Sequence, residues 1–274
     1  MQTKTNSSLG NLIAGTFEFL SLVYHSVVRD VRKTNGNAVQ ALLMEIAQSA
    51  LVVAFFYVLI TFMGLRGVAV RGSFVLYVLT GVFLYITHNK GISSVSAGSA
   101  NSPMLKHAPV STLMMITAGA ISALYVQILA VLVISFVANV IIDPFTVYNL
   151  KYVSLCFLVA WFSGCAIGII FLSITPYFPN AMQIITQIYK RANMIFSGKM
   201  FLANTLPSYM LPFFVWNPLF HTIDQARGAA FVNYFPRYTS LEYAVYLSLT
   251  LIVVGMMLEH MSRKVVSESW NARR

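Results

Sequence analysis

Charged side chains are scarce in this chain. Of its 274 residues only 9% are Asp, Glu, Lys or Arg, whereas 58% are hydrophobic, and the mean hydropathy is +0.73. A soluble domain carries about 25% charged residues, so this chain cannot cover a surface that faces water. The composition excludes an ordinary soluble domain and predicts that the bilayer surrounds most of its apolar side chains.

Acidic residues are the scarcest of the charged types. There are eight of them against 18 Lys and Arg, which gives a net charge of +10. A basic balance of this size can indicate nucleic-acid binding. Here, however, the cations stand at the ends of apolar runs and form no basic groove. The excess of positive charge on cytosolic segments of membrane proteins explains them better, and we expect no nucleic-acid partner.

Cysteines and catalytic motifs are also few. Cys156 and Cys165 are nine residues apart on one predicted helix, about 13 Å along its axis, which is too far for a disulfide. The five histidines have no metal-ligand spacing, and GxSxG is absent. The Gly198–Lys199 pair lacks the rest of a phosphate-binding loop. These absences predict no enzyme, metal or cofactor in this chain, so ATP-driven transport would need a separate ATPase.

Six apolar runs are present, and each predicts a membrane-spanning helix. The third is long enough to tilt or to extend beyond the bilayer. The fold class predicted is an all-α membrane protein with six transmembrane helices. The runs are 41–63, 73–87, 112–142, 152–174, 180–201 and 241–258.

The six runs define the domain organisation. Residues 1–40 form a cytosolic N-terminus, 41–260 the six-span domain and 261–274 a cytosolic tail. Six spans place both termini on one side of the membrane. Lys and Arg are more frequent in the segments on that side than in those on the other, which predicts that both termini are cytosolic.

The N-terminal region has an amphipathic pattern. Residues 11–28 place apolar side chains at helical spacing, with a polar opposite face. This pattern predicts a helix that lies in the membrane plane, and a helix docked on protein is the alternative. Arg29, Arg32 and Lys33 follow it and mark the cytosolic side.

Lys190 and Arg191 lie about ten residues inside the fifth run, which is roughly 15 Å of helix. That depth is about half the thickness of the hydrocarbon core, and charges there usually face a water-filled cavity or a partner. Their neighbours Tyr189 and Asn193 could hydrogen-bond a sugar. These four residues are the predicted substrate path, with snorkelling of the cations to an interface as the alternative.

Glu45, near the start of the first span, is predicted to pair with a cation on another helix.

Two connecting segments have patterns of their own. The polar segment after the second span contains MLKHAPV, and Pro103 and Pro109 predict a short helix there that docks a soluble partner. Before the last span, 208–215 and 218–231 are too short to cross and are separated by Asn217–Pro218. We predict that they form two re-entrant helices on the external side, within 206–235, and leave Arg227 external.

The order of these motifs resembles a known family. In chain order the motifs are FPN, a helix with Lys190, FSGKMF, LP, WNPLFHTIDQAR and a last span with a basic tail. In the order of these motifs the chain resembles the permease subunits of type-2 ABC exporters. The likeness is to capsular polysaccharide exporters, with O-antigen and teichoic acid permeases as cousins. It covers nearly the whole chain, and WNPLFH…R is its most specific part. One departure is that relatives usually have a proline in the first span, which TNGNAVQALLMEIAQSA lacks.

The resemblance implies an assembly and a cargo. Two copies of the permease and two ATP-binding subunits, which hold ATP and Mg, would move a lipid-linked polysaccharide across the bacterial inner membrane. Periplasmic and outer-membrane export proteins would be further partners. The resemblance implies ATPase coupling by Arg29, Arg32, Lys106, His107 and Pro109. It implies an external re-entrant motif near the exit, formed by Asn217, Pro218, His221 and Arg227.

Two other classes of function compete with this one. An ion-coupled carrier or channel would act without an ATPase, but carriers often have two homologous halves and no internal repeat is visible here. A structural membrane scaffold is the third possibility, and it gives no reason for cations inside an apolar run.

Overall fold

The computed structural model describes residues 21, 25, 38–62, 64, 72–97 and 112–271. Within these ranges the chain is helical and has no strand, which confirms the all-α class. Short 3-10 turns occur at Ala203–Thr205 and Leu211–Phe213. The long elements are α2 (Ala38–Phe62), α3 (Phe74–Ser96), α4 (Thr112–Val137) with the π-helical turn η3 (Ala138–Ile142), α5 (Leu150–Ile174), α6 (Pro179–Phe196), α7 (Pro218–Ala230) and α8 (Leu241–Asn271).

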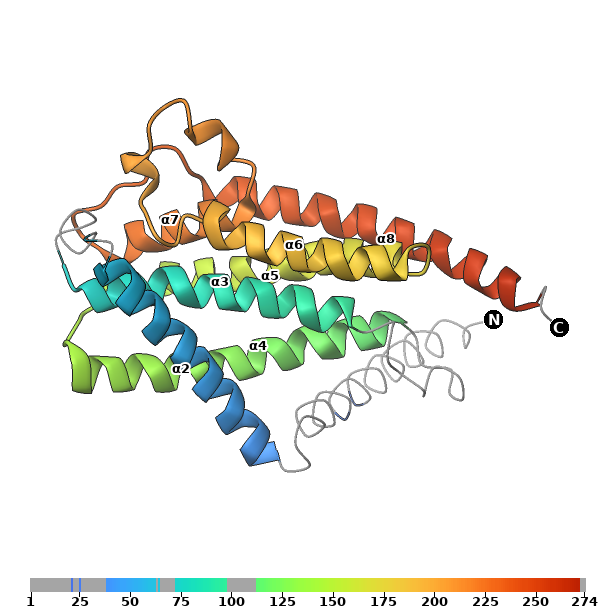
Figure 1. The fold of residues 1–274 in the computed structure, drawn as a ribbon, viewed down its shortest axis with the longest axis horizontal. Helices are drawn as coiled ribbons and strands as arrows, with labels where there is room; N and C mark the ends of the chain where they lie inside the picture. The colour runs from blue at the N-terminus through green and yellow to red at the C-terminus, as the bar shows by residue number, and fades with distance from the viewer. Residues whose placement is uncertain are drawn as a thin grey trace, which may run out of the picture.

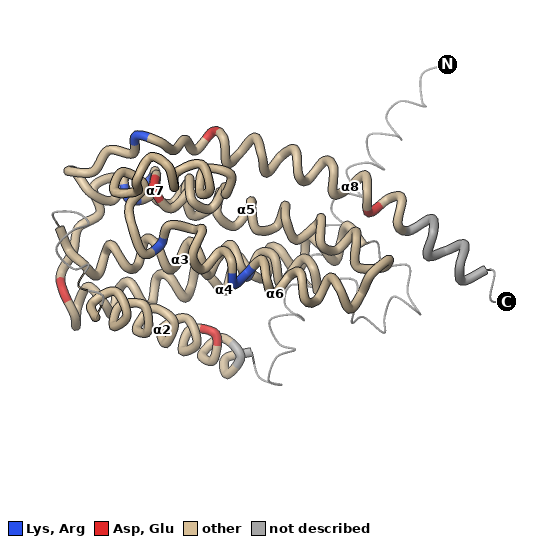
Figure 2. The backbone as a smooth tube through the Cα atoms, turned by 45° about the horizontal axis from the view of Figure 1, so that its top comes forward, with Lys and Arg blue, Asp and Glu red and all other residues tan. Residues whose placement is uncertain are grey.

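The helices form one elongated bundle (Figure 1). Helices α3, α4, α5, α6 and α8 run along its long axis, and α2 crosses them obliquely. The short helix α7 and the irregular chain before it lie together at one end. Helix α5 is central, because it packs against α3, α7 and α8. Figure 2 shows how few charged residues lie along the bundle.

Four helices are long and apolar enough to cross a membrane: Leu42–Phe62, Thr112–Ile142, Leu150–Ile174 and Leu241–Ser262. They match four of the six predicted spans closely. Helices α3 and α6 run beside them without reaching that hydropathy. Most of α3 is buried among other helices, so protein groups can satisfy its polar side chains. The count of six spans therefore stays a prediction.

The second predicted span is longer than the sequence suggested. We expected a polar connecting segment from His88, but α3 continues to Ser96. The hydroxyls of Ser93 and Ser96 donate to carbonyls of their own helix, so these polar residues do not interrupt it. Close packing on α5 is possible because Gly164 has no side chain, as a Cβ there would lie 2.2 Å from the His88 carbonyl oxygen. The boundary predicted from hydropathy alone, at residue 87, therefore lies before the end of α3 at Ser96.

The fifth predicted span is shorter than expected. It was predicted to reach residue 201, but α6 ends at Phe196. Gly198 follows in the left-handed conformation, with φ 69°, which a side chain would disfavour and which commonly ends helices. The chain from 197 to 202 then turns back into the bundle.

Of the two short helices predicted before the last span, one forms. The first segment, 208–215, makes only the 3-10 turn Leu211–Phe213, since Pro207 and Pro212 remove backbone donors. The second is α7, whose start was predicted correctly. The Asn217 side chain accepts from the Leu219 N–H, and Pro218 takes the first helical position. Whether either segment is re-entrant stays a prediction.

Most of the ATPase-coupling set lies outside the described residues. This holds for Arg29 and Arg32, and for Lys106, His107 and Pro109 of the KHAPV segment. It also holds for all but two positions of the amphipathic helix 11–28. Their predicted roles therefore remain predictions.

Candidate functional site

Helix α6 turns the polar side chains of Tyr189, Lys190 and Asn193 toward the bundle, whereas those of Gln183, Gln187 and Arg191 are exposed. Asn193 is 3% exposed, whereas Ile184, Ile188 and Ile195 on the other face are 59–60% exposed. Polar side chains that face the bundle while isoleucines are exposed are the reverse of the pattern in a soluble amphipathic helix. We call the contact between α6 and α3 the polar seam. Its residues are Tyr85, His88 and Ser93 on α3, and Tyr189, Lys190 and Asn193 on α6.

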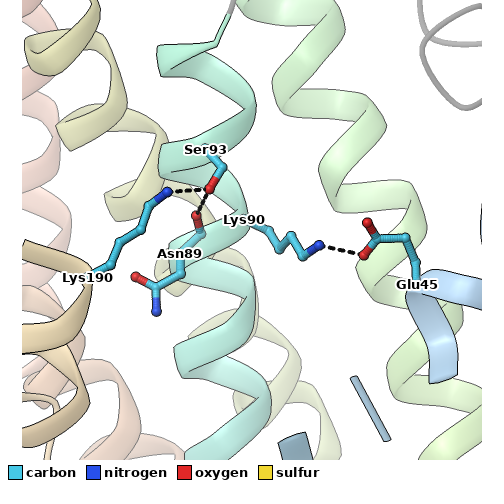
Figure 3. Close-up of polar contacts among 5 residues, drawn as sticks. All are labelled: Glu45, Asn89, Lys90, Ser93 and Lys190. Carbon is cyan, nitrogen blue, oxygen red and sulfur yellow. Dashed lines mark hydrogen bonds and ion pairs between the residues drawn. The ribbon is translucent and has the colours of Figure 1, made fainter. Parts of the chain in front are cut away.

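Lys190 is the cation of the polar seam. Its side chain is half-buried, and its Nζ donates to the Ser93 Oγ at 2.6 Å (Figure 3). The Ser93 hydroxyl in turn donates to the Asn89 carbonyl at 2.8 Å, and the Tyr85 hydroxyl donates to the Lys190 carbonyl at 3.3 Å. Within the described residues no carboxylate pairs with Lys190. Its charge is therefore held in place and remains available to an anionic group.

A second lysine lies on the opposite side of α3. The Lys90 Nζ is 2.5 Å from the Glu45 Oε2 on α2, and Figure 3 shows Lys190 reaching toward α3 from one side while Lys90 leaves α3 on the other side toward Glu45. The predicted pairing of Glu45 with a cation on another helix is confirmed. Because Glu45 neutralises Lys90, Lys190 is the unpaired cation of the two.

His88 joins three helices at the seam. It is fully buried, and its Nδ1 lies 2.9 Å from the Ser163 Oγ and 3.2 Å from the Ala160 carbonyl on α5. Its Nε2 lies 3.5 Å from the Tyr189 hydroxyl on α6. Sequence reasoning considered the histidines only as metal ligands and missed this role. The available signal was a histidine that directly follows an apolar run.

Two residues predicted for different functions meet at the seam. The Asn217 Nδ2 donates to the Asn193 Oδ1 at 2.6 Å and to the Phe196 carbonyl at 3.2 Å. The start of α7 is thereby tied to the end of α6. Arg191, predicted to share the path with Lys190, is exposed and lies outside the seam, and its path role stays a prediction. Consecutive residues on a helix point about 100° apart, so one position separates a seam residue from a surface residue.

Arg227 is buried inside the bundle, and its predicted place on the external side of the membrane stays a prediction. It is 1% exposed, and its guanidinium donates to the Gly198 carbonyl at 2.8 Å, the Phe201 carbonyl at 2.6 Å and the Lys199 carbonyl. Its Cζ lies 4.1 Å from the ring centroid of Tyr77. The planar fork of arginine suits such multiple contacts. Arg227 therefore fastens the chain after α6 to α7 and α3.

His221 has a fastening role as well. Its Nε2 lies 2.8 Å from the Val215 carbonyl, and its Nδ1 accepts from the Ser240 N–H at 3.0 Å. These partners require the tautomer with the proton on Nε2. The contacts of four residues thus hold the chain together at the end of the bundle: Asn217, Pro218, His221 and Arg227. The sequence did not predict these packing contacts.

Lys199 is the most buried lysine of the described chain, with 0% exposure. Its Nζ lies 3.2 Å from the ring centroid of Tyr85 and 3.9 Å from that of Phe56, and it has no hydrogen-bond partner. The ring faces favour the cation, but burial lowers the pKa of Lys199 to about 7. Sequence reasoning placed Lys199 in an incomplete phosphate loop and in the FSGKMF motif, and gave it no role of its own.

This burial predicts a pH-dependent stability. The pKa of Lys199 falls from 10.5 to about 7 on folding, so the unfolded chain holds the proton between those pH values and the folded chain does not. The free energy of unfolding should therefore rise with pH from 7 toward 10, by about 1.4 kcal/mol per pH unit at most. Thermal unfolding in detergent at pH 7.0, 8.0 and 9.0 measures it.

The Lys199→Met variant should remove this pH dependence and match or exceed the wild-type melting temperature at pH 7. Lys151 is exposed, so Lys151→Met changes the net charge equally and serves as the control. A pH slope that is the same in wild type and Lys199→Met would contradict the prediction.

Comparison with known proteins gives two relatives. No family model matches the chain. Two proteins of Escherichia coli described as polysialic acid transport protein KpsM are 24% and 23% identical to it. Each alignment spans 187 residues, which is 68% of this chain and 72% of the relative. This similarity confirms the resemblance of the chain to the permease subunits of type-2 ABC exporters.

Proposed function

We propose that this chain is the permease subunit of an ATP-driven exporter that moves an acidic, lipid-linked polysaccharide across the bacterial inner membrane. O-antigen and teichoic acid are alternative cargoes within the same class. Two copies of the chain and two ATP-binding subunits would form the transporter, with both termini of each copy in the cytosol.

The observation that supports this proposal most is the unpaired Lys190 at the polar seam. A half-buried cation without a carboxylate partner is costly in a membrane protein unless an anion visits it. Polysialic acid, named in the description of both relatives, carries one carboxylate on each sugar. A cation, a tyrosine hydroxyl and an amide along one helix face are suited to a polymer with both charge and hydroxyl groups.

The polar seam also suits a path that opens and closes. Hydrogen bonds such as Lys190 to Ser93 join helix α6 to α3, and a passing hydroxyl or carboxylate can replace them at small net cost. An interdigitated apolar contact would lose more on separation. The seam is therefore the place where we expect polymer to pass.

Affinity purification of the tagged chain from its native membrane tests the proposal. An ATP-binding subunit should co-purify, and surface polysaccharide should disappear when the lysine of that subunit's phosphate-binding loop is replaced. If polymer export continues with this inactive subunit, an ion-coupled carrier is the better description. Deletion of the chain itself is the reference for complete loss of export.

A further inference from the structure

A small pocket is lined by residues of α7 and its neighbours, and Figure 1 shows that α7 lies at one end of the bundle. Its volume is about 220 Å³, and it opens between the start of α5, the end of α7 and the chain around 234–236. Sites that enclose whole drug-sized ligands measure about 300–1,000 Å³. This pocket is therefore of a size for a single ring.

Aromatic residues and small residues line the pocket. Tyr148 and Phe235 line it and are 69% and 74% exposed. Gly228 and Ala229 line it as well, and a Cβ at Gly228 would lie 2.5 Å from Pro236. Glycine is thus required for the chain to close around the pocket. The exposed rings of Tyr148 and Phe235 can pack against a flat, partly apolar ligand.

The polar groups of the pocket are neutral and hydrogen-bonding. Asn149 uses its side-chain oxygen to accept from the Tyr152 N–H at 3.1 Å, which leaves its amide N–H groups for a ligand. The Tyr152 hydroxyl donates to the Gln225 Oε1 at 3.3 Å and can still accept. No Asp, Glu, Lys or Arg is among the described residues that line the pocket.

From this lining we infer that the pocket is a subsite for one uncharged face of a sugar ring. A pyranose has a face of C–H groups, which packs on an aromatic ring, and a rim of hydroxyls, which amide and phenol groups bind. The inference rests on the proposed function, since the ring would belong to the exported polymer. It adds a contact point remote from Lys190 that recognises the neutral part of a repeat unit.

Saturation-transfer NMR on the full chain in nanodiscs, with galactose and N-acetylglucosamine as probes, tests the inference. At least one sugar should receive saturation from the wild type. The Tyr148→Ala and Asn149→Ser variants should lower the transfer at least threefold, and serine retains the helix cap at that position. Tyr246→Ala is the control, because Tyr246 is similarly exposed, at 67%, on α8. Melting temperatures verify that each variant is folded.

The outcomes separate this inference from the proposed function. Absence of transfer from the wild type to both sugars, or equal transfer from Tyr148→Ala, would overturn the subsite while leaving export untouched. Binding of sugar by a chain whose deletion does not change surface polymer would support the subsite and contradict the export function.

Discussion

Replacing Arg227 with Met should prevent stable accumulation of the protein in the membrane. The substitution removes the donors that satisfy the carbonyls of Gly198, Lys199 and Phe201 and leaves these acceptors buried. Each unsatisfied group costs about 1–3 kcal/mol. The sum is comparable with the whole stability of a typical protein, about 5–15 kcal/mol. Quantitative immunoblots of membrane fractions, and melting temperatures of any purified protein, measure the effect.

Two further variants isolate the cause. Gly81→Ala keeps the charge but places a Cβ 2.8 Å from the Arg227 Nη2 and 2.9 Å from the Lys199 carbonyl oxygen, so it should destabilise by displacing the same contacts. Arg237 is exposed, and Arg237→Met should accumulate normally. Wild-type abundance and melting temperature in Arg227→Met would show that the carbonyl contacts contribute little.

The sequence predicted the helices better than the polar contacts between them. Apolar runs located α2, α4, α5 and α8, because a helix that crosses the bilayer needs about 20 predominantly apolar residues in succession. The same rule failed for α3, whose polar C-terminal half faces protein. A helix buried among helices can carry His88 and Ser93 where hydropathy predicts a loop.

The candidate site was found only in part, for a related reason. A cation inside an apolar run identified Lys190, but sequence distance could not say that Arg191 faces outward. Arg227 and Lys199 are buried by contacts with segments far away in the chain, namely the carbonyls after α6 and the rings of Phe56 and Tyr85. No local pattern encodes those partners, so the sequence could not predict that Arg227 and Lys199 are buried inside the bundle.

Replacing Lys190 with Gln should reduce polymer export on the order of tenfold to a hundredfold. A hydrogen bond from a charged group contributes about 1.5–3 kcal/mol, and each 1.4 kcal/mol is a factor of about ten in rate. Glutamine retains most of the side-chain length and a donor for Ser93, but it offers no charge to a carboxylate. Surface polymer per permease molecule, with permease measured by immunoblot, is the readout.

Matched variants decide whether the charge or the hydrogen bond matters. Arg191 neighbours Lys190 in sequence but is exposed, so Arg191→Gln should export near the wild-type level. Ser93→Ala removes the acceptor of the Lys190 Nζ while the cation remains, and it should retain most of the export, as should Lys190→Arg. Equal losses in Lys190→Gln and Ser93→Ala would assign Lys190 a packing role. Normal export by Lys190→Gln at normal abundance would remove it from the path, because an acidic polymer that crosses at the seam cannot be indifferent to its unpaired cation.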